Sequence, residues 1–323
     1  MVIEPQPASG TASSAFRRVV DNVRLVIAGN DAAVHAAVAC LFADGNLLLE
    51  GVPGVGKTTL AQALAISIGG SSSRVQSTPD LLPSDLTGIS VYEQVHGEFR
   101  FVPGPIFANV VLVDEINRAT PRTQSALLEP MEERQVTVEG VTHELPRPYL
   151  VIATENPVEQ HGTYPLPEGQ LDRFAMSVHV GYPDEDGSTD LVRRQLARHP
   201  LRDLAPVLEP DEVLAAQEAV RGVYVDEGVL RYAVALVTAT RSAPEVALGA
   251  SPRASVWLVR VAQSTALAEG RDHVLPDDVK DAAVPVLAHR LVAGPARGGP
   301  GMREVVRAVV DEVPVPLHTA RRG

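Results

Sequence analysis

The stretch that decides the fold runs from Leu47 to Ile68 and reads LLLEGVPGVGKTTLAQALAISI. Its first four residues form a short apolar run without periodicity, which is typical of a strand buried on both faces. The residues from Thr59 onward place apolar side chains at helical spacing. Between this strand and this helix lies the segment Gly51-Val52-Pro53-Gly54-Val55-Gly56-Lys57-Thr58, which matches the phosphate-loop pattern in the strand-loop-helix context that the pattern requires.

The phosphate loop predicts a site for a polyphosphate. Its glycines let the backbone wrap around phosphate groups, so that successive N–H groups and the helix N-terminus point at them. Lys57 would reach the β- and γ-phosphates, and the Thr58 hydroxyl would ligate Mg²⁺. A glycine-rich turn that merely joins strand to helix is the alternative, but such a turn does not need the Lys-Thr pair. We therefore expect the nucleotide to contact Gly51, Pro53, Gly54, Val55, Gly56, Lys57, Thr58 and Thr59.

A second apolar run, from Val110 to Val113, ends in the carboxylates of Asp114 and Glu115 and so forms a Walker B pattern. Ligands of parallel sheets bind beyond the carboxyl ends of the strands. Asp114 is therefore expected to hold Mg²⁺, and Glu115 to polarise a water for in-line attack on the γ-phosphorus. An acidic strand end that stood alone would more simply be a cap, but here it accompanies a phosphate loop.

A third apolar run, from Tyr149 to Ala153, leads to Asn156. An amide at the tip of a neighbouring strand can hydrogen-bond the attacking water or the γ-phosphate, so Asn156 is a candidate catalytic residue. The alternative is a turn, because Asn before a proline commonly starts one.

Short apolar runs at 47–50, 110–113, 149–153 and 177–180 alternate with helix-length segments, which predicts an α/β sandwich with a parallel sheet. Segments 89–102 and 135–145 alternate apolar and polar residues around His96-Gly97 and Glu139-Gly140, and each predicts a β-hairpin inserted into that core. Amphipathic helices take over after residue 183, and we expect them at 186–198, 210–221, 226–240, 252–269, 276–291 and 303–312.

The chain is therefore expected to have four parts. These are a flexible tail over 1–14, a nucleotide-binding αβα domain over 15–183, an all-helical domain over 184–313 and a second flexible tail over 314–323.

Composition excludes several classes of protein. With 45% hydrophobic and 21% charged residues among 323, global disorder is excluded. Lys and Arg number 28 against 40 Asp and Glu, and the net charge of −12 repels polyanions, which disfavours nucleic acid as a partner.

The sequence contains no recognisable secretory signal or membrane span, so a cytoplasmic protein is expected. Cys40 is the only cysteine, which excludes an internal disulfide, and the nine histidines show no metal-ligand spacing.

Five segments together resemble the MoxR family of AAA+ ATPases over about residues 15–295. They are GPIFAN at 104–109, DEINRA at 114–119, ATENP at 153–157, GTYPLPE at 162–168 and LDRF at 171–174. The resemblance implies that Asn156 is the first sensor, that Arg173 is an arginine finger and that Arg253, within GASPRA at 249–254, is the second sensor. The hairpins at 89–102 and 135–145 look like the helix-2 insert and the pre-sensor-1 hairpin of this clade.

The residues alone are compatible with both arginine roles. Arg173 follows Asp172, so a local ion pair between them, or another surface ion pair, is the alternative for Arg173. Arg253 lies in the first turn of a helix that Ser251 caps, where a cation opposes the helix dipole. An anionic partner such as a nucleotide phosphate would remove that conflict.

The resemblance also implies a way of working. ATP and Mg²⁺ would be the cofactors, and an arginine supplied in trans would require a homo-oligomer, which in this family is a hexameric ring. Hydrolysis would drive chaperone-like remodelling or activation of client proteins, frequently with a partner that carries a von Willebrand factor A domain.

Two other functions stay open. A switch or scaffold that binds ATP with negligible turnover is disfavoured by intact Lys57, Asp114, Glu115 and Asn156. A DNA-handling motor of the related clade is disfavoured by the net charge of −12 and by hairpin tips without Lys or Arg.

Three positions depart from the family's usual pattern. Pro130 interrupts the helix expected over 121–133, so a kink or an early end is expected. Glu155 stands where Gln is usual and adds negative charge beside the γ-phosphate site, and Gly169 stands where Ala is usual.

Overall fold

The computed structural model describes residues 8–27, 29–51, 55–155, 163–181, 200–294 and 301–316, together with Glu185 and Thr189. Its centre is a five-stranded sheet with the order β2-β5-β8-β1-β9, and all neighbouring strands are parallel. The strands are β1 (Leu47–Glu50), β2 (Ser72–Gln76), β5 (Val110–Asp114), β8 (Leu150–Glu155) and β9 (Met176–His179). The predicted α/β sandwich is confirmed. Sequence reasoning missed β2, because only Val75 is buried in this polar edge strand.

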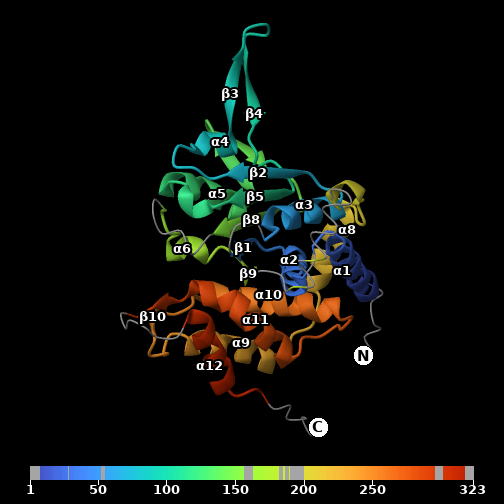
Figure 1. Cartoon of the computed structure of the whole chain (residues 1–323), viewed down its shortest axis with the longest axis vertical. Helices are drawn as coiled ribbons and strands as arrows, with labels where there is room; N and C mark the ends of the chain where they lie inside the picture. The colour runs from blue at the N-terminus through green and yellow to red at the C-terminus, as the bar shows by residue number, and fades with distance from the viewer. Residues whose placement is uncertain are drawn as a thin grey trace.

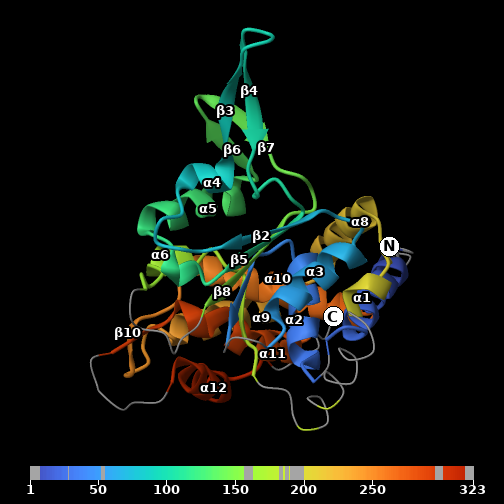
Figure 2. The ribbon, with the colours of Figure 1, turned by 45° about the horizontal axis from the view of Figure 1, so that its top comes forward.

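Helices cover both faces of the sheet (Figure 2). Because side chains alternate along a strand, Leu47 and Leu49 pack with Leu60 on one face, whereas Leu48 packs with Leu127 on the other. The first face carries α1 (Ala8–Arg24), α2 (Asp31–Phe42) and α3 (Lys57–Ser67), and the second carries α4 (Pro83–Thr87) and α5 (Pro121–Glu133).

Both predicted hairpins are confirmed. One is formed by β3 (Gly88–Glu93) and β4 (Glu98–Pro103), and the other by β6 (Gln135–Val138) and β7 (Val141–Glu144). Phe101 of the first hairpin stacks on His143 of the second with ring centroids 3.9 Å apart. The β3–β4 hairpin projects far beyond the body of the molecule (Figure 1).

The C-terminal part is helical, as predicted, and most of it lies below the sheet in Figure 1. Its helices are α8 (Pro210–Arg221), α9 (Glu227–Ala239), α10 (Pro252–Ala268), α11 (Pro276–Leu287) and α12 (Met302–Glu312). A small antiparallel pair, β10 (Val246–Leu248) with β11 (Val292–Ala293), was not foreseen. Of the helix expected at 186–198 only Thr189 is among the described residues, and it is helical. In the described part no helix is long and apolar enough to cross a membrane.

Helix α1 begins at Ala8, inside the expected tail over 1–14, so that expectation is wrong from Ala8 onward. Ala12 and Ser13 are buried, and the Ser13 hydroxyl donates to the Ala268 carbonyl over 3.1 Å. Small residues pack closely between helices without large apolar side chains, so composition alone wrongly predicted a flexible tail here.

A kink or an early end was expected at Pro130. Helix α5 continues to Glu133, so the early end does not occur. Proline removes one backbone hydrogen bond inside a helix. Neighbouring contacts hold the end of α5 in place: Met131 is buried in the core, and its carbonyl accepts a hydrogen bond of 3.2 Å from the Asn46 side chain.

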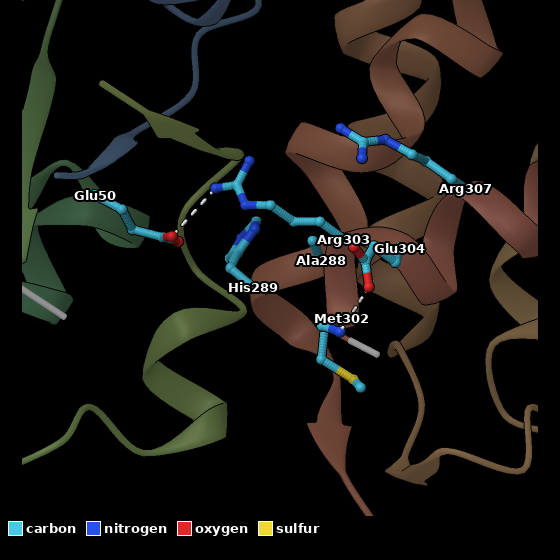
Figure 3. A pocket seen from close by; sticks show the side chains of 8 residues that line it. Glu50, Ala288, His289, Met302, Arg303, Glu304 and Arg307 are labelled. Atoms are coloured by element: carbon cyan, nitrogen blue, oxygen red, sulfur yellow. Dashed lines mark hydrogen bonds and ion pairs between the residues drawn. The ribbon is translucent and has the colours of Figure 1, made fainter. Parts of the chain in front are cut away.

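An ion pair connects the last helix to the sheet. Arg303 of α12 reaches Glu50 at the end of β1, with Nη2 and Oε2 3.1 Å apart (Figure 3). The Ser177 hydroxyl of β9 donates to the same carboxylate. A cavity of about 450 Å³ lies beside this pair and is lined also by His289 and Arg307. Since Glu50 directly precedes Gly51, α12 is attached to the strand from which the phosphate loop begins.

Glu155 lies next to Glu50, because the two residues are partners in the register of β8 and β1. Burial, with a smaller contribution from the Glu50 charge, raises the pKa of the Glu155 carboxyl above its ordinary value. The carboxyl group of Glu155 therefore lies where its ionised form is disfavoured in the folded protein.

The raised pKa gives a prediction for Glu155→Gln. The native state holds the Glu155 proton more tightly than the unfolded chain does, so stability falls as pH rises from about the ordinary value of 4.5 to the raised native pKa. Gln cannot ionise, so the variant lacks this loss. Its advantage in free energy of unfolding should grow across that window by about 1.4 kcal/mol per pH unit and then stay constant. Urea denaturation at several pH values measures it.

Glu129→Gln, at an exposed position of α5, is the control and should follow the wild-type curve. A difference between Glu155→Gln and wild type that does not change with pH would contradict the prediction.

Candidate nucleotide site

The phosphate loop joins β1 to α3 at the carboxyl edge of the sheet. Gly51 has φ +155°, and a Cβ there would lie 2.4 Å from the carbonyl oxygen of Val180, the residue after β9, so no other residue fits without moving that backbone. Gly56 has φ +89° and forms the N-cap of α3. Val55 is buried, whereas Val52, Pro53 and Gly54 lie outside the described residues.

Lys57 is the first residue of α3, and its Nζ donates to the Gly51 carbonyl over 2.8 Å. Burial lowers the pKa of this amine, and the charges of Asp114 and Glu115 oppose that shift. The ammonium is thus partly withdrawn from water at the mouth of the loop, where it would bind an anion more strongly than in solvent. Thr58 and Thr59 follow in the first turn of α3 and are half-buried.

Asp114 ends β5 and is buried, with only 6% of the residue exposed. Its Oδ2 accepts a hydrogen bond of 2.7 Å from Arg74 Nε of β2, and its Oδ1 accepts one of 3.3 Å from the Thr154 hydroxyl. Three parallel neighbours, β2, β5 and β8, therefore fix this carboxylate.

Glu115 follows with left-handed backbone angles, φ 55° and ψ 50°. Its N–H donates to the Thr154 hydroxyl over 2.9 Å, which holds the turn against β8. The Oε2 atom lies 3.1 Å from Gln76 Nε2 and 3.1 Å from Arg118 Nε. The side chain is thus oriented from both sides, as a residue that orients a water must be.

The chemistry of these groups fits a magnesium ion. Thr58 offers a hydroxyl and Asp114 a carboxylate, and Mg²⁺ prefers such oxygen ligands, usually few from protein together with phosphate oxygens. The part of the chain that the structure describes contains no cluster of three or more His, Cys, Asp or Glu side chains that could hold a metal by itself. The hydroxyl of Thr58 and the carboxylate of Asp114 therefore suit a metal ion that is bound partly by the protein and partly by the phosphates of a nucleotide.

Strand β8 lies between β5 and β1, so its carboxyl end separates the acidic pair from the phosphate loop. Thr154 and Glu155 occupy that end. Asn156, the candidate sensor, is the next residue in the chain and lies outside the described residues. Its catalytic role therefore stays a prediction.

The two candidate arginines lie at the other edge of the sheet. Arg173 precedes β9, whereas Lys57 follows β1, and the two strands are parallel, so these residues flank opposite ends of the sheet. Arg253 lies with Arg173: the Nη1 atoms of both contact the Glu132 carboxylate, at 2.6 Å from Arg253 and 3.3 Å from Arg173.

The ion pair of Arg173 with Asp172, which the sequence left open, does not form. Asp172 instead pairs with buried Arg290 over 3.0 Å and accepts a hydrogen bond of 2.8 Å from Ser251, the N-cap of α10. A surface ion pair of Arg173 is present, but its partner is Glu132.

The structure thus forms two groups of side chains. Lys57, Thr58, Asp114 and Glu115 gather at the carboxyl edge, and Arg173 and Arg253 gather at the amino edge.

Sequence reasoning missed Arg74, Gln76, Thr154 and Glu132. The first two belong to the strand that was not predicted, and Thr154 stood in a quoted motif without a role. Gly169, where a Cβ would meet nothing within 4 Å, has no structural requirement for glycine.

Comparison with known proteins supports the same assignment. Residues 46–176 match the model of an ATPase family associated with various cellular activities (AAA), and residues 238–312 match an AAA lid domain. A crystal structure of a protein from Cytophaga hutchinsonii superposes with a TM-score of 0.89 at 37% identity, covering 96% of this chain and 97% of that one.

Named relatives are similar over most of their length. Chaperone MoxR1 of Mycobacterium tuberculosis is 42% identical over 89% of this chain and 79% of its own. Protein MoxR of Methylorubrum extorquens is 32% identical over 94% of this chain and 95% of its own. YeaC of Bacillus subtilis, described as uncharacterized, is 45% identical over 93% of this chain and 95% of its own. The chain therefore belongs to the MoxR family of AAA+ ATPases.

Proposed function

We propose that this chain binds ATP with Mg²⁺ at its phosphate loop, hydrolyses it at a site shared between neighbouring subunits of a ring, and thereby remodels client proteins. The observation that carries the proposal is the placement of Arg173 and Arg253 at the sheet edge opposite Lys57. A hexamer is the ring size that the family resemblance implies.

Within one chain, the residues at the carboxyl edge bind the nucleotide and orient the attacking water. Lys57 and the N–H groups of the loop bind the β- and γ-phosphates, and Asn156 contacts the γ-phosphate. Glu115 accepts a hydrogen bond from the attacking water, which adds to the γ-phosphorus as the bond to the β,γ-bridging oxygen breaks. The products are ADP and inorganic phosphate. Thr58 and Asp114 would hold the Mg²⁺, which neutralises phosphate charge when bound.

The arginines are supplied by the neighbour. Strand β9 has four residues, which span about 13 Å at 3.3 Å per residue, and Arg173 precedes it. Neither Arg173 nor Arg253 is therefore placed to contact the nucleotide of its own chain. A head-to-tail interface brings the amino edge of one subunit to the carboxyl edge of the next, and repeated interfaces of this kind close into a ring.

The β3–β4 hairpin supports a protein client over DNA. Near its tip, Tyr92, Val95 and Phe99 are 52%, 87% and 72% exposed, and the Tyr92 and Phe99 rings lie 5.3 Å apart. The carboxylates of Glu93 and Glu98 flank this tip and would repel phosphates; the cation of the adjacent strand is Arg100, and His96 at the tip lies 3.4 Å from the Glu93 carboxylate. An exposed apolar tip fits an apolar segment of polypeptide. A partner with a von Willebrand factor A domain is carried by the family resemblance alone.

Two substitutions separate binding from hydrolysis. Glu115→Gln keeps the shape of the side chain but weakens its interaction with water, so ATP should still bind while turnover falls by roughly 10²-fold or more. Lys57→Ala should lose ATP binding, because it removes the phosphate-binding cation. Isothermal titration and phosphate release measure the two effects. Wild-type protein that binds ATP without turnover would favour the scaffold function, and unchanged binding by both variants would exclude the phosphate loop as the site.

A mixing experiment tests the shared site. Arg173→Ala should bind ATP as wild type does but hydrolyse it about 10³-fold more slowly, as is typical of arginine fingers. Lys57→Ala lacks the phosphate site but keeps its arginines. Mixed rings contain interfaces that combine an intact phosphate site with an intact finger, so activity should return on mixing. Arg231→Ala, at an exposed arginine of α9, is the control and should stay fully active. Absence of recovery in verified mixed rings would contradict the shared site.

The hairpin makes a separate prediction. Phe99→Ser should weaken binding of a fluorescently labelled unfolded polypeptide by roughly 10-fold, since central aromatic contacts commonly dominate such interfaces. Basal ATP hydrolysis should not change. Val234→Ser, at an exposed apolar residue of α9, is the matched control. Fluorescence anisotropy measures both, and binding of labelled duplex DNA that Phe99→Ser abolishes would favour the DNA motor instead.

A further inference from the structure

A single carboxylate connects the two arginines at the amino edge. Glu132 Oε1 lies 2.6 Å from Arg253 Nη1, and Glu132 Oε2 lies 3.3 Å from Arg173 Nη1. The three residues come from α5, from α10 and from the turn before β9. Their side chains stay partly accessible, at 30% for Glu132, 30% for Arg173 and 45% for Arg253. Glu132 therefore joins the sandwich to the helical domain at an accessible surface.

Helix α5 itself gives Glu132 no stabilising role. The residue lies in the last turn of α5, where a negative charge is unfavourable because it faces the negative end of the helix dipole. Two like-charged guanidinium groups near the carboxylate offset that cost, and without the carboxylate they would repel each other. The position of Glu132 is thus explained by the arginines.

Surrounding contacts hold the backbone that carries each of these three side chains. The Asn46 side chain donates to the carbonyl of Met131, next to Glu132, over 3.2 Å. Asp172, next to Arg173, accepts hydrogen bonds from Ser251 at 2.8 Å and from Arg290 at 3.0 Å. Because Ser251 caps the helix that begins just before Arg253, the backbones that carry the two arginines are held relative to each other.

We propose that Glu132 is a positioning residue for hydrolysis in the neighbouring subunit. It holds Arg173 and Arg253 close together, so that both guanidinium groups reach one phosphate chain at the same time. The ion pairs with Glu132 involve Nη1 of each arginine. A guanidinium has five N–H donors, so donors remain for phosphate oxygens. This inference rests on the proposed ATPase function and adds a residue that does not touch the nucleotide.

The first test is Glu132→Gln, which keeps the size of the side chain and removes its charge. The expected result is a fall in kcat of roughly 10-fold or more with unchanged affinity for ATP, because the phosphate loop of the same chain is intact. Glu133→Gln removes an equal charge from the adjacent residue of α5 and should keep the wild-type kcat. Unchanged or raised kcat for Glu132→Gln would overturn the proposal, since raised kcat would mean that the carboxylate restrains the arginines.

The second test assigns the defect to one side of the interface. In mixed rings of Glu132→Gln with Lys57→Ala, the Lys57→Ala chain supplies intact Glu132, Arg173 and Arg253 to the intact phosphate site of the other chain. Activity should return on mixing. A merely structural defect within the Glu132→Gln chain, or a role toward its own nucleotide, gives no recovery, and that result would overturn the proposal.

A double variant tests whether Glu132 acts through the arginines. If it does, adding Glu132→Gln to Arg253→Ala should reduce kcat by a smaller factor than Glu132→Gln does in the wild-type chain. Equal factors would mean independent action and would overturn the proposal. Wild-type turnover and recovery in the mixture of Arg173→Ala with Lys57→Ala are measured alongside. If those two fail, the proposed function is wrong, whereas their success with a silent Glu132→Gln refutes only the role of Glu132.

Discussion

The common direction of the five strands is the constraint on which the rest of the molecule depends. Parallel strands place every strand end at one edge and every strand start at the other. Lys57, Asp114 and Glu115 follow strands, and they gather at the carboxyl edge. Arg173 precedes a strand, and Arg253 joins it through Glu132 at the amino edge. In the function proposed above, one chain thus carries two halves of a site that its own sheet keeps apart.

The helical domain is attached to both edges by ion pairs that lie beside functional residues. At the carboxyl edge, Arg303 of α12 pairs with Glu50, the residue before the phosphate loop. At the amino edge, Arg290 pairs with Asp172, the residue before Arg173. Burial lowers the pKa of Arg290 to about 10 while Asp172 opposes that shift, so this pair is a buried anchor that would be costly to break. A displacement of the helical domain would therefore move the residue before the phosphate loop and the residue before Arg173.

Much of this arrangement could be predicted from the sequence, because each prediction used a local signal. The phosphate loop, the acidic strand end and the Gly-centred hairpins are each recognised within a few residues. The strand and helix that flank the loop, the acidic strand end and both hairpins lie where expected. Strand β2 could not be predicted from the sequence, because its residues are mostly polar and its position depends on pairing with β5. Arg74 and Gln76 were missed with it. Glu132 and Arg173 are 41 positions apart in sequence (173 − 132), and only tertiary packing brings them into contact.

The backbone of Glu115 shows how one local constraint divides two tasks between adjacent residues. Two neighbouring carboxylates in an extended strand would alternate across the sheet, with one directed into the core. The left-handed angles of Glu115 end the strand there, and the Thr154 hydroxyl stabilises the turn by accepting from the Glu115 N–H and donating to Asp114. Asp114 is then held by Arg74 inside the sheet edge, and Glu115 is held by Gln76 and Arg118 outside it. The first position suits a metal ligand and the second suits a group that orients water, and the Thr154 hydroxyl, bonded to both residues, holds the two carboxylates in these different positions.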